Sequence, residues 1–519
     1  MYIFAKYLRM TKVLCKLFSN VHEMNQNQLM KMEDYFKQFK EKTIGYDLKM
    51  QTPFGQKEVL YADWIASGRL YQPIEKKIQD QFGPWVANTH TETSETGTLT
   101  TRSYHWAHQI IKEHVNADEN DILITNGNGM TGVVNKFQRI LGLKSCGKIV
   151  NNKCIQNANN ERPVVFITHM EHHSNQTSWL ETNSDVVVLE PNEDLTVNSD
   201  TLRAQLKKFK DRKLKIGSFT ACSNVTGVHT NYHELAKIMH QNGGVCFIDF
   251  AANAPYEDMN MHPEDPEEAL DAIFFSPHKF LGGPGSSGVL IFNKALYTNK
   301  SPDHPGGGTV DWTNPWGEYK YVDNIEARED GGTPGFLQAI RIALALKLKE
   351  QMGVDKIAQR EKELVKMAFE LLLPIPKVKI LSDHLQDRLG VISFYIEDIH
   401  YNLVVKALND RYGIQLRGGC ACAGTYGHFL MGITSDISKK ITERISKGDL
   451  SSKPGWVRLS LHPTMTDQEL KYISQAIADL SANISEWEKD YIYNPKNNEF
   501  KHKEEKGNKD EMVKSWFEF

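Results

Sequence analysis

FFSPHKFLGGPGSSG, residues 274–288, is the most informative stretch of the sequence. An apolar, Phe-rich run ends here, and Ser276, His278 and Lys279 follow it before a series of glycines and a proline. Apolar surroundings lower the pKa of a lysine toward the neutral amine, which is the form that attacks a carbonyl group. Most lysines lie at the protein surface, but a stretch this rich in apolar residues and glycine is not typical of a surface segment. Lys279 is therefore the first candidate for a catalytic residue.

Upstream of this stretch, short β-rich runs alternate with segments such as residues 232–239, in which apolar side chains recur at helical spacing. This alternation predicts βαβ units, and hence an α/β fold with a mostly parallel sheet covered by helices on both faces. Ligands of such sheets bind at the carboxyl ends of the strands, so the polar residues after each run are candidate site residues. The β-rich runs lie at residues 122–125, 164–168, 186–189, 216–220 and 245–249.

A glycine-rich turn, NGNGMTG at residues 126–132, follows the first of these runs and leads into an apolar helix. The free N–H groups and the positive dipole end of a helix N-terminus suit a phosphate, which makes Thr131 a candidate contact. The glycines also satisfy a purely backbone requirement for a tight turn. The turn is not a Walker loop, because no Gly-Lys-Ser/Thr follows it.

Two further strand ends carry candidates of other kinds. HMEHHSN, residues 169–175, lacks the His-Glu-x-x-His order of a zinc helix, so we expect no metal there, and a planar imidazole can instead lie flat on an aromatic ligand. Asp249 ends the last run among apolar residues, where a buried carboxylate needs a cation or a strong donor. Both a protonated ring nitrogen and a nearby backbone N–H would serve. Together with Lys279 and the phosphate-suited turn, these are the parts that a pyridoxal phosphate site needs.

At this point the sequence resembles a known family. It is similar to the class V aminotransferase family of fold-type I pyridoxal phosphate enzymes, and within it to the branch of group II cysteine desulfurases and selenocysteine lyases. The resemblance covers roughly residues 61–480 and implies a large domain with a mixed, mainly parallel sheet and a smaller C-terminal α/β domain. The matching motifs are YADWIASGRLYQP (61–73), NTH (88–90), MEHHSN (170–175), DFAANAP (249–255), SPHKFLGGPG (276–285), GGGTV (306–310), GGTPG (331–335), RGGCACAG (417–424) and VRLSLHPT (457–464).

The resemblance implies a role for each matching residue. Lys279 would form a Schiff base with the cofactor, Asp249 would pair with the ring nitrogen, and His172 would stack on the ring as a catalytic residue. The remaining cofactor contacts that it implies are Thr131, Ser276, His278, Asn253 and, from the other subunit of a homodimer, Thr333. The substrate contacts that it implies are Arg458 as a clamp for a carboxylate, Arg417, Asn175 and His90.

The activity implied by the resemblance is removal of sulfur or selenium from cysteine or selenocysteine, which gives alanine. Cys422 matches the position of the catalytic thiol, and nearby Arg417 would favour its thiolate form. The implied partners are an amino acid substrate, a second copy of the chain and a sulfur acceptor protein.

Several positions depart from this branch and leave the type of reaction open. Ala252 stands where a glutamine is common, Thr91 and Glu92 replace Arg-Gly after NTH, and the CACAG loop lacks a histidine. A class V aminotransferase, epimerase or lyase without a catalytic thiol is one alternative, and a dimeric pseudoenzyme scaffold is another. Cys420 and Cys422 are also compatible with inert packing, a redox pair or half of a metal site.

Composition excludes several classes of protein. The 61 Lys and Arg against 65 Asp and Glu give a net charge of −4, too balanced for a dedicated nucleic-acid binder. No uninterrupted apolar run approaches the length of about eighteen residues that a membrane-spanning helix needs. The 7 cysteines are too sparse for a disulfide scaffold and fit a reducing compartment such as the cytoplasm.

Motifs and composition divide the 519 residues into parts. We expect residues 1–45 to be a basic N-terminal extension, compatible with mitochondrial import, and residues 485–519 to be a charged, solvated tail. Residues 46–330 would form the large cofactor domain, with a polar insertion at 145–162, and residues 331–484 the small domain.

Overall fold

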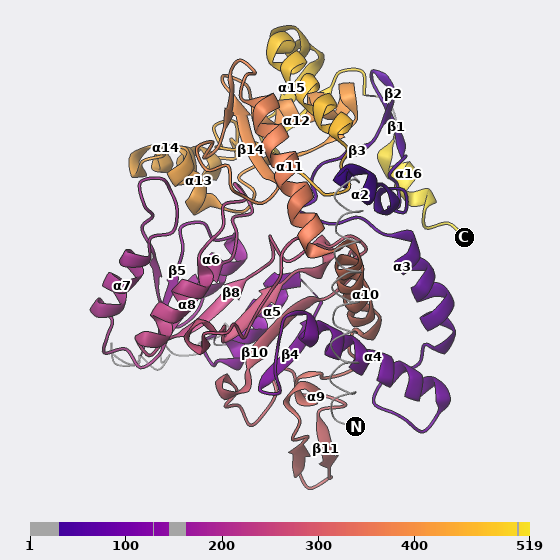
Figure 1. The fold of residues 1–519 in the computed structure, drawn as a ribbon, viewed down its shortest axis with the longest axis vertical. Coiled ribbons are helices and arrows are strands. Elements are labelled where there is room, and N and C mark those ends of the chain that lie inside the picture. The colour runs from indigo at the N-terminus through magenta and orange to yellow at the C-terminus, as the bar shows by residue number, and fades with distance from the viewer. Residues whose placement is uncertain (1–30, 128, 145–161, 506–507) are drawn as a thin grey trace, which may run out of the picture.

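The computed structural model describes residues 31–127, 129–144, 162–505 and 508–519, so most of the expected basic extension and of the insertion at 145–162 lies outside the described residues. Figure 1 shows one large sheet in the lower part of the molecule and a smaller sheet in the upper part, each covered by helices. The α/β fold is therefore confirmed.

The large sheet has seven strands in the order β4-β10-β9-β8-β7-β5-β6. Only β10 runs antiparallel to its neighbours, so the sheet is mixed and mainly parallel, as the sequence predicts. Its strands are β4 (Asp121–Asn126), β5 (Val164–Ile167), β6 (Asp185–Val188), β7 (Lys215–Thr220), β8 (Val245–Asp249), β9 (Ala272–Phe275) and β10 (Gly288–Asn293).

Side chains alternate between the two faces of this sheet because successive residues of a strand point to opposite sides. On β9, Ile273 and Phe275 belong to an apolar cluster with residues of α4, α7, α8 and α10, whereas Phe274 belongs to a second cluster with residues of α5 and Trp179 of α6. Both faces are thus buried, which explains the nearly continuous apolar runs. The covering helices are α4 (Glu95–His114), α5 (Gly129–Ile140), α6 (His173–Leu180), α7 (Ser199–Lys208), α8 (Tyr232–Gln241) and α10 (Phe336–Met352).

The small sheet has four antiparallel strands in the order β13-β14-β17-β16. It packs against three long helices around its own apolar core. The strands are β13 (Val378–Ile380), β14 (Val391–Ile396), β16 (Arg417–Gly419) and β17 (Trp456–Ser460), and the helices are α11 (Val354–Leu372), α12 (Tyr401–Tyr412) and α15 (Asp467–Trp487).

Segments from the N-terminal side join this C-terminal part. Phe36 and Phe39 of α2 (Met32–Lys40) are buried, and β3 (Leu60–Tyr61) pairs in parallel with β15 (Ile414–Gln415). The domain boundaries in the sequence stay a prediction, but these segments place parts of residues 31–61 beside the small sheet. Short elements complete the chain: β1 (Lys49–Thr52), β2 (Gly55–Glu58), α3 (Gln72–Lys77), β11 (Val310–Thr313), β12 (Tyr319–Tyr321), α9 (Ile325–Glu329), α13 (Gly424–Leu430) and α14 (Ser435–Ser446).

The expectation of a solvated tail is wrong for residues 491–502. They form a hairpin of β18 (Tyr491–Asn494) and β19 (Glu499–His502), which is followed by α16 (Lys509–Ser515). Tyr491 and His502 are buried and their rings meet edge to face, while Asn498 in the turn donates to the Tyr401 hydroxyl at 2.7 Å. A few buried contacts thus anchor this part of the charge-rich C-terminal segment.

Within the described ranges, no helix is both long enough and apolar enough to cross a membrane.

Candidate active site

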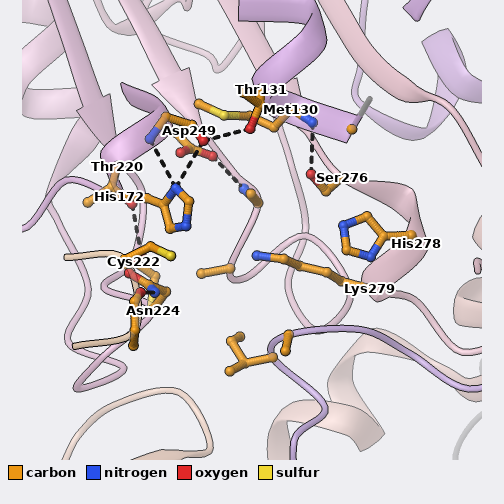
Figure 2. Close-up of a pocket in the computed structure, with 18 of the residues that line it drawn as sticks. Met130, Thr131, His172, Thr220, Cys222, Asn224, Asp249, Ser276, His278 and Lys279 are labelled. Atoms are coloured by element: carbon orange, nitrogen blue, oxygen red, sulfur yellow. Dashed lines mark hydrogen bonds between the residues drawn. The ribbon is translucent and has the colours of Figure 1, made fainter. Parts of the chain in front are cut away.

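A cavity of about 470 Å³ lies at the carboxyl ends of the large-sheet strands, where it meets residues from β16 and β17. Figure 2 shows Lys279 reaching into it opposite His172, with Asp249 above the imidazole in this view. Most of the predicted site residues therefore meet in one place. The predicted residues that line it are Thr131, His172, Asp249, Ser276, His278, Lys279, Arg417, Cys422 and Arg458.

Lys279 stands on a short 3-10 turn directly after β9. Burial lowers its pKa to about 8, although the nearby Asp249 carboxylate opposes the shift. The turn is held by close backbone contacts, because a Cβ at Gly68 would lie 2.0 Å from the carbonyl oxygen of Phe280. Glycine at position 68 thus allows the segment from the N-terminal side to pack closely over the turn that carries Lys279. The lowered pKa increases the fraction of the neutral Lys279 amine, which is the form that attacks a carbonyl group.

Asp249 ends β8 and is buried. Burial raises its pKa to about 6, and one of its oxygens accepts the backbone N–H of Ala251 at 2.8 Å. The local hydrogen bond considered from the sequence is therefore present, and the same carboxylate also faces the cavity. A cationic ring nitrogen placed there would compensate the buried charge.

His172 is the N-cap of α6, and its Nδ1 accepts the backbone N–H of Ser174 at 3.1 Å. Burial, aided by the charge of Lys279, lowers its pKa to about 3, so the imidazole is neutral at physiological pH. A fixed, uncharged ring suits stacking on an aromatic ligand. The Ser174 hydroxyl also contacts Thr131 Oγ at 2.6 Å, which joins the starts of α5 and α6.

The start of α5 forms a cradle suited to a phosphate. Gly129 has a φ of +58°, and a Cβ there would lie 3.2 Å from Ser276 Oγ. Ser276 Oγ accepts the backbone N–H of Met130 at 2.9 Å, and His278 lies beside the same glycine. Helix N–H groups, two hydroxyls and an imidazole provide the donors that a phosphate binds. Lys279, Asp249, His172 and this cradle together fit pyridoxal phosphate.

Asp63 is a site residue that the sequence interpretation missed. Its carboxylate accepts from Arg458 Nη2 at 3.0 Å and from Arg417 Nε at 2.9 Å, and these two arginines are directly paired in the β16–β17 register. Arg458 is only 4% exposed, so its charge needs this partner. One carboxylate against two guanidinium groups leaves one positive charge at the cavity, which suits a substrate carboxylate. An acidic residue between the apolar residues of YADWIA was the available signal.

Cys422 lies in a strained turn at the cavity wall. Ala421 and Cys422 have φ values of +50° and +56°, and the Ala423 N–H donates to the Cys420 carbonyl at 3.0 Å. Two successive residues other than glycine in the left-handed region cost on the order of 1 kcal/mol each, so surrounding contacts must hold them. Cys422 is exposed, whereas Cys420 is half-buried against an apolar cluster, which agrees with the packing interpretation for Cys420 alone.

Residues of the large domain hold this turn. The His173 N–H donates to the Cys422 carbonyl at 2.7 Å, and His173 Nε2 accepts the N–H of Gly424 at 2.9 Å. Asn224, also missed from the sequence, lines the cavity and donates to the Ala421 carbonyl at 2.7 Å. The thiol position is thus fixed from outside its own loop.

Two of the predicted contacts, Asn175 and Asn253, are not among the residues that line this cavity. Asn175 is fully buried: its amide N–H groups bond to Glu171 and the Ser218 carbonyl, and its oxygen accepts from Trp179 and the Ser218 hydroxyl. Asn253 is buried and donates to Glu257 at 2.8 Å. Within the protein, Asn175 uses both amide N–H groups as donors and its oxygen as an acceptor of two hydrogen bonds. The amide N–H of Asn253 is directed to Glu257.

His90 and Thr333 also lie outside this cavity, on the exposed surface. Thr333 donates to Asn88 at 3.2 Å, and a Cβ at Gly308 would lie 3.5 Å from His90 Nε2. The two glycine-rich motifs and NTH therefore gather at one place on the surface.

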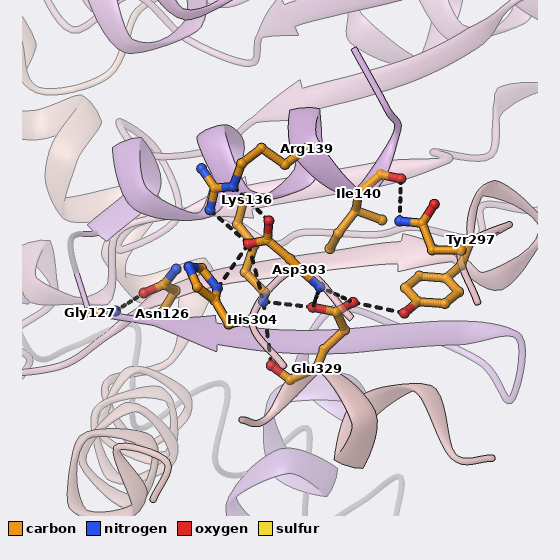
Figure 3. Close-up of polar contacts among 10 residues, drawn as sticks. Asn126, Gly127, Lys136, Arg139, Ile140, Tyr297, Asp303, His304 and Glu329 are labelled. Carbon is orange, nitrogen blue, oxygen red and sulfur yellow. Dashed lines mark hydrogen bonds and ion pairs between the residues drawn. The ribbon is translucent and has the colours of Figure 1, made fainter. Parts of the chain in front are cut away.

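A buried ion network connects α5 with the loops that lead to this surface (Figure 3). Lys136 of α5 pairs with Glu329 at 2.7 Å, and Arg139 forms a bidentate pair with Asp303 at 2.7 and 2.8 Å. The side chains of Lys136 and Glu329 are 4% and 0% exposed, and Tyr297 donates to Glu329 at 2.8 Å. The network fixes α5, whose start forms the cradle suited to a phosphate, to the part of the chain just before GGTPG.

Replacing Lys136 by methionine is expected to destabilise the fold by about 3–5 kcal/mol, because it leaves the Glu329 carboxylate buried without its cation. The urea midpoint of unfolding measures the loss. The matched control is Lys366→Met, since Lys366 is 79% exposed with a 3.9 Å ion pair, and the expected change there is under about 1 kcal/mol. A similar midpoint for both variants would contradict the role of the network.

Comparison with known proteins agrees with this geometry. The family described as Aminotransferase class-V matches residues 60–473. A probable cysteine desulfurase of Halalkalibacterium halodurans is 27% identical over 392 residues, covering 73% of this chain and 89% of that protein. One of Staphylococcus epidermidis is 28% identical over 380 residues, covering 72% and 85%.

Solved structures share the fold. The apo structure of a cysteine desulfurase from Thermococcus onnurineus gives a TM-score of 0.66 at 22% identity and covers 82% of this chain and 95% of that chain. The cysteine desulfurase CsdA of Escherichia coli gives 0.64 at 21% identity and covers 84% and 97%. Because the family match spans most of the chain and the fold agrees, the protein belongs to the class-V aminotransferase family.

Proposed function

We propose that the protein is a pyridoxal phosphate-dependent cysteine desulfurase, or a selenocysteine lyase of the same mechanism. The observation that carries the proposal is the presence of Cys422 in the same cavity as Lys279 and Arg458. An aminotransferase, epimerase or simple lyase has no need of a thiol at that place. The names of the relatives at 27–28% identity support the same choice.

The residues at the strand ends would hold the cofactor. Lys279 provides the amine, Asp249 the anion for the ring nitrogen, His172 the flat neutral ring, and the start of α5 the phosphate donors. When bound, pyridoxal phosphate supplies an electron sink that stabilises negative charge at the α-carbon of an amino acid. A dimer in which Thr333 of the partner subunit adds a phosphate contact is part of this proposal, supported by the exposure of Thr333.

The substrate would be oriented by its carboxylate on Arg458, with Asp63 fixing the direction of the guanidinium. The neutral amine of Lys279 is suited to remove the α-proton at Nζ, because its pKa of about 8 lies near the working pH.

The thiolate of Cys422 would then attack the sulfur of the substrate. A sulfur–sulfur bond forms and the carbon–sulfur bond breaks, and the electron pair of the broken bond stays with carbon, which takes up a proton. Alanine leaves, and the persulfide remains on Cys422.

The test is to incubate the cofactor-loaded protein with L-cysteine, L-selenocysteine or an amino donor with a keto acid. We expect alanine together with protein-bound persulfide or its selenium counterpart, and cyanide to release the sulfur as thiocyanate. Amino transfer to the keto acid without alanine from either substrate would favour the aminotransferase alternative. Absence of all these products in a protein that binds the cofactor would favour the scaffold.

A further inference from the structure

A second, larger cavity of about 1160 Å³ lies between the small domain and the C-terminal hairpin. One wall comes from α12 and β16, and the other from β18, β19 and the residues after them. The hairpin, residues 491–502, lies beyond residues 60–473 that match the family. This groove is therefore built in part from a segment outside the matched region.

The groove and the cysteine turn are neighbours along the chain. Arg417 lines the active-site cavity, whereas Gly418 and Gly419, the next residues of β16, line the groove, and Cys420–Cys422 follow directly. Lys453 lines the groove as well, and its charge acts on His173, which donates to the Cys422 carbonyl. The two cavities are thus adjacent on either side of β16.

The groove is positively charged. Its lining contains five lysines against two glutamates, and one glutamate, Glu505, already pairs with Lys406 and Lys509 at 3.2 and 2.7 Å. Lys453 and Lys501 form no ion pair within 4.0 Å among the described residues. The lysines that line the groove are Lys406, Lys453, Lys501, Lys503 and Lys509. Such a lining attracts an acidic ligand and lowers the affinity for a basic one.

The groove also offers a free sheet edge. β16 is the last strand of the small sheet, and in the described parts of the chain no further strand pairs with its outer side. An extended peptide can add to such an edge through main-chain hydrogen bonds. The direction of β16 would lead a bound strand toward Cys422.

Segments of this chain outside the described residues do not suit the groove. Residues 1–30 carry Lys6, Arg9, Lys12 and Lys16 against the single acid Glu23, and residues 145–161 carry two lysines against one glutamate. Both have a net positive charge, which the lysines of the groove would repel. Charge thus favours a different chain as the occupant.

We propose that this groove binds an extended acidic segment of a thiol-bearing protein that accepts sulfur from Cys422. This inference rests on the proposed desulfurase activity. The acceptor thiolate attacks the outer sulfur of the Cys422 persulfide, a new sulfur–sulfur bond forms, and the old one breaks with its electron pair returning to Cys422 Sγ. The persulfide is then on the acceptor, and no external oxidant or reductant is needed.

The experiment uses the cofactor-loaded full chain with L-cysteine and two synthetic peptides of equal length, each with one cysteine. One peptide is rich in Asp and Glu, and the other has Asn and Gln at the same positions. We expect the acidic peptide to take up sulfur with a kcat/KM roughly tenfold higher than the neutral one at low salt, and the ratio to fall as salt rises.

The variant Lys453→Glu/Lys501→Glu is expected to bring the ratio of the two peptides close to one. The matched control is Lys366→Glu/Lys471→Glu on exposed faces of α11 and α15, which should keep the tenfold ratio. Fluorescence anisotropy of the acidic peptide with its cysteine replaced by serine measures binding without turnover, and should show the same dependence on the two groove lysines.

Equal rates for the two peptides, or a preference that survives the double substitution, would overturn the docking proposal while leaving the desulfurase intact. Dithiothreitol, a small acceptor that has no acidic segment, separates a failure of the docking proposal from a failure of the desulfurase activity. If no alanine forms even with dithiothreitol, the desulfurase activity itself fails, and the acceptor groove fails with it.

Discussion

Substitution of Lys279 by alanine is expected to lower kcat for alanine release by about 10⁴-fold or more, even with saturating cofactor. The substitution removes both the amine that attaches the cofactor and the base that moves the α-proton, and a positioned base alone contributes about 10²–10⁴-fold. Borohydride should no longer fix the cofactor to the protein, which mass spectrometry of the reduced protein measures. Normal turnover by Lys279→Ala would contradict the assignment of the whole site.

Lys349 provides the matched control, because burial lowers its pKa to about 8 as well. Its amine donates to the carbonyl of Ala254 at 2.8 Å and also to that of Glu257, and it does not line the cavity. Lys349→Met is expected to reduce stability but to retain cofactor fixation in the folded fraction. A depressed pKa alone therefore does not identify the reactive lysine; its access to the cavity does.

The pH dependence of cofactor loading tests the state of Lys279 directly. Since its pKa is lowered to about 8, the neutral amine should predominate above that pH. The loading rate of the apoprotein should rise up to about pH 8 and then level off. An ordinary lysine with a pKa of about 10.4 would give a rate that still rises well above pH 9.

The fold and the centre of the site were accessible from the sequence because both depend on local patterns. A β-rich run followed by a polar residue is visible within about ten residues, and the sheet topology then brings Asp249, His172 and Lys279 together at the strand ends. Asp63 escaped notice because its partners, Arg417 and Arg458, are more than 350 residues away along the chain.

Other features depend on tertiary contacts that composition does not reveal. The hairpin at 491–502 lies in a charge-rich C-terminal segment, yet the buried rings of Tyr491 and His502 and the bond from Asn498 to Tyr401 anchor it. Asn175 lies in a motif that matches the family, but the structure satisfies its amide within the protein. A polar residue near a site is thus a contact only where its donors and acceptors remain free.

Substitution of Cys422 by alanine is expected to lower alanine release from L-cysteine by about 10³-fold and to abolish protein-bound persulfide, while the cofactor still loads on Lys279. Alanine keeps the Cβ, so the backbone strain at a φ of +56° is unchanged and the effect reports on Sγ alone. The rate of alanine release, a persulfide assay and the visible spectrum of the loaded protein measure the three outcomes.

Cys420→Ala is the control, because Cys420 is half-buried against apolar side chains, and the activity of this variant should stay within about threefold of the wild type. Full activity in Cys422→Ala would place the protein among class V enzymes that need no thiol, because Lys279, Asp249 and Arg458 would then account for the reaction without it.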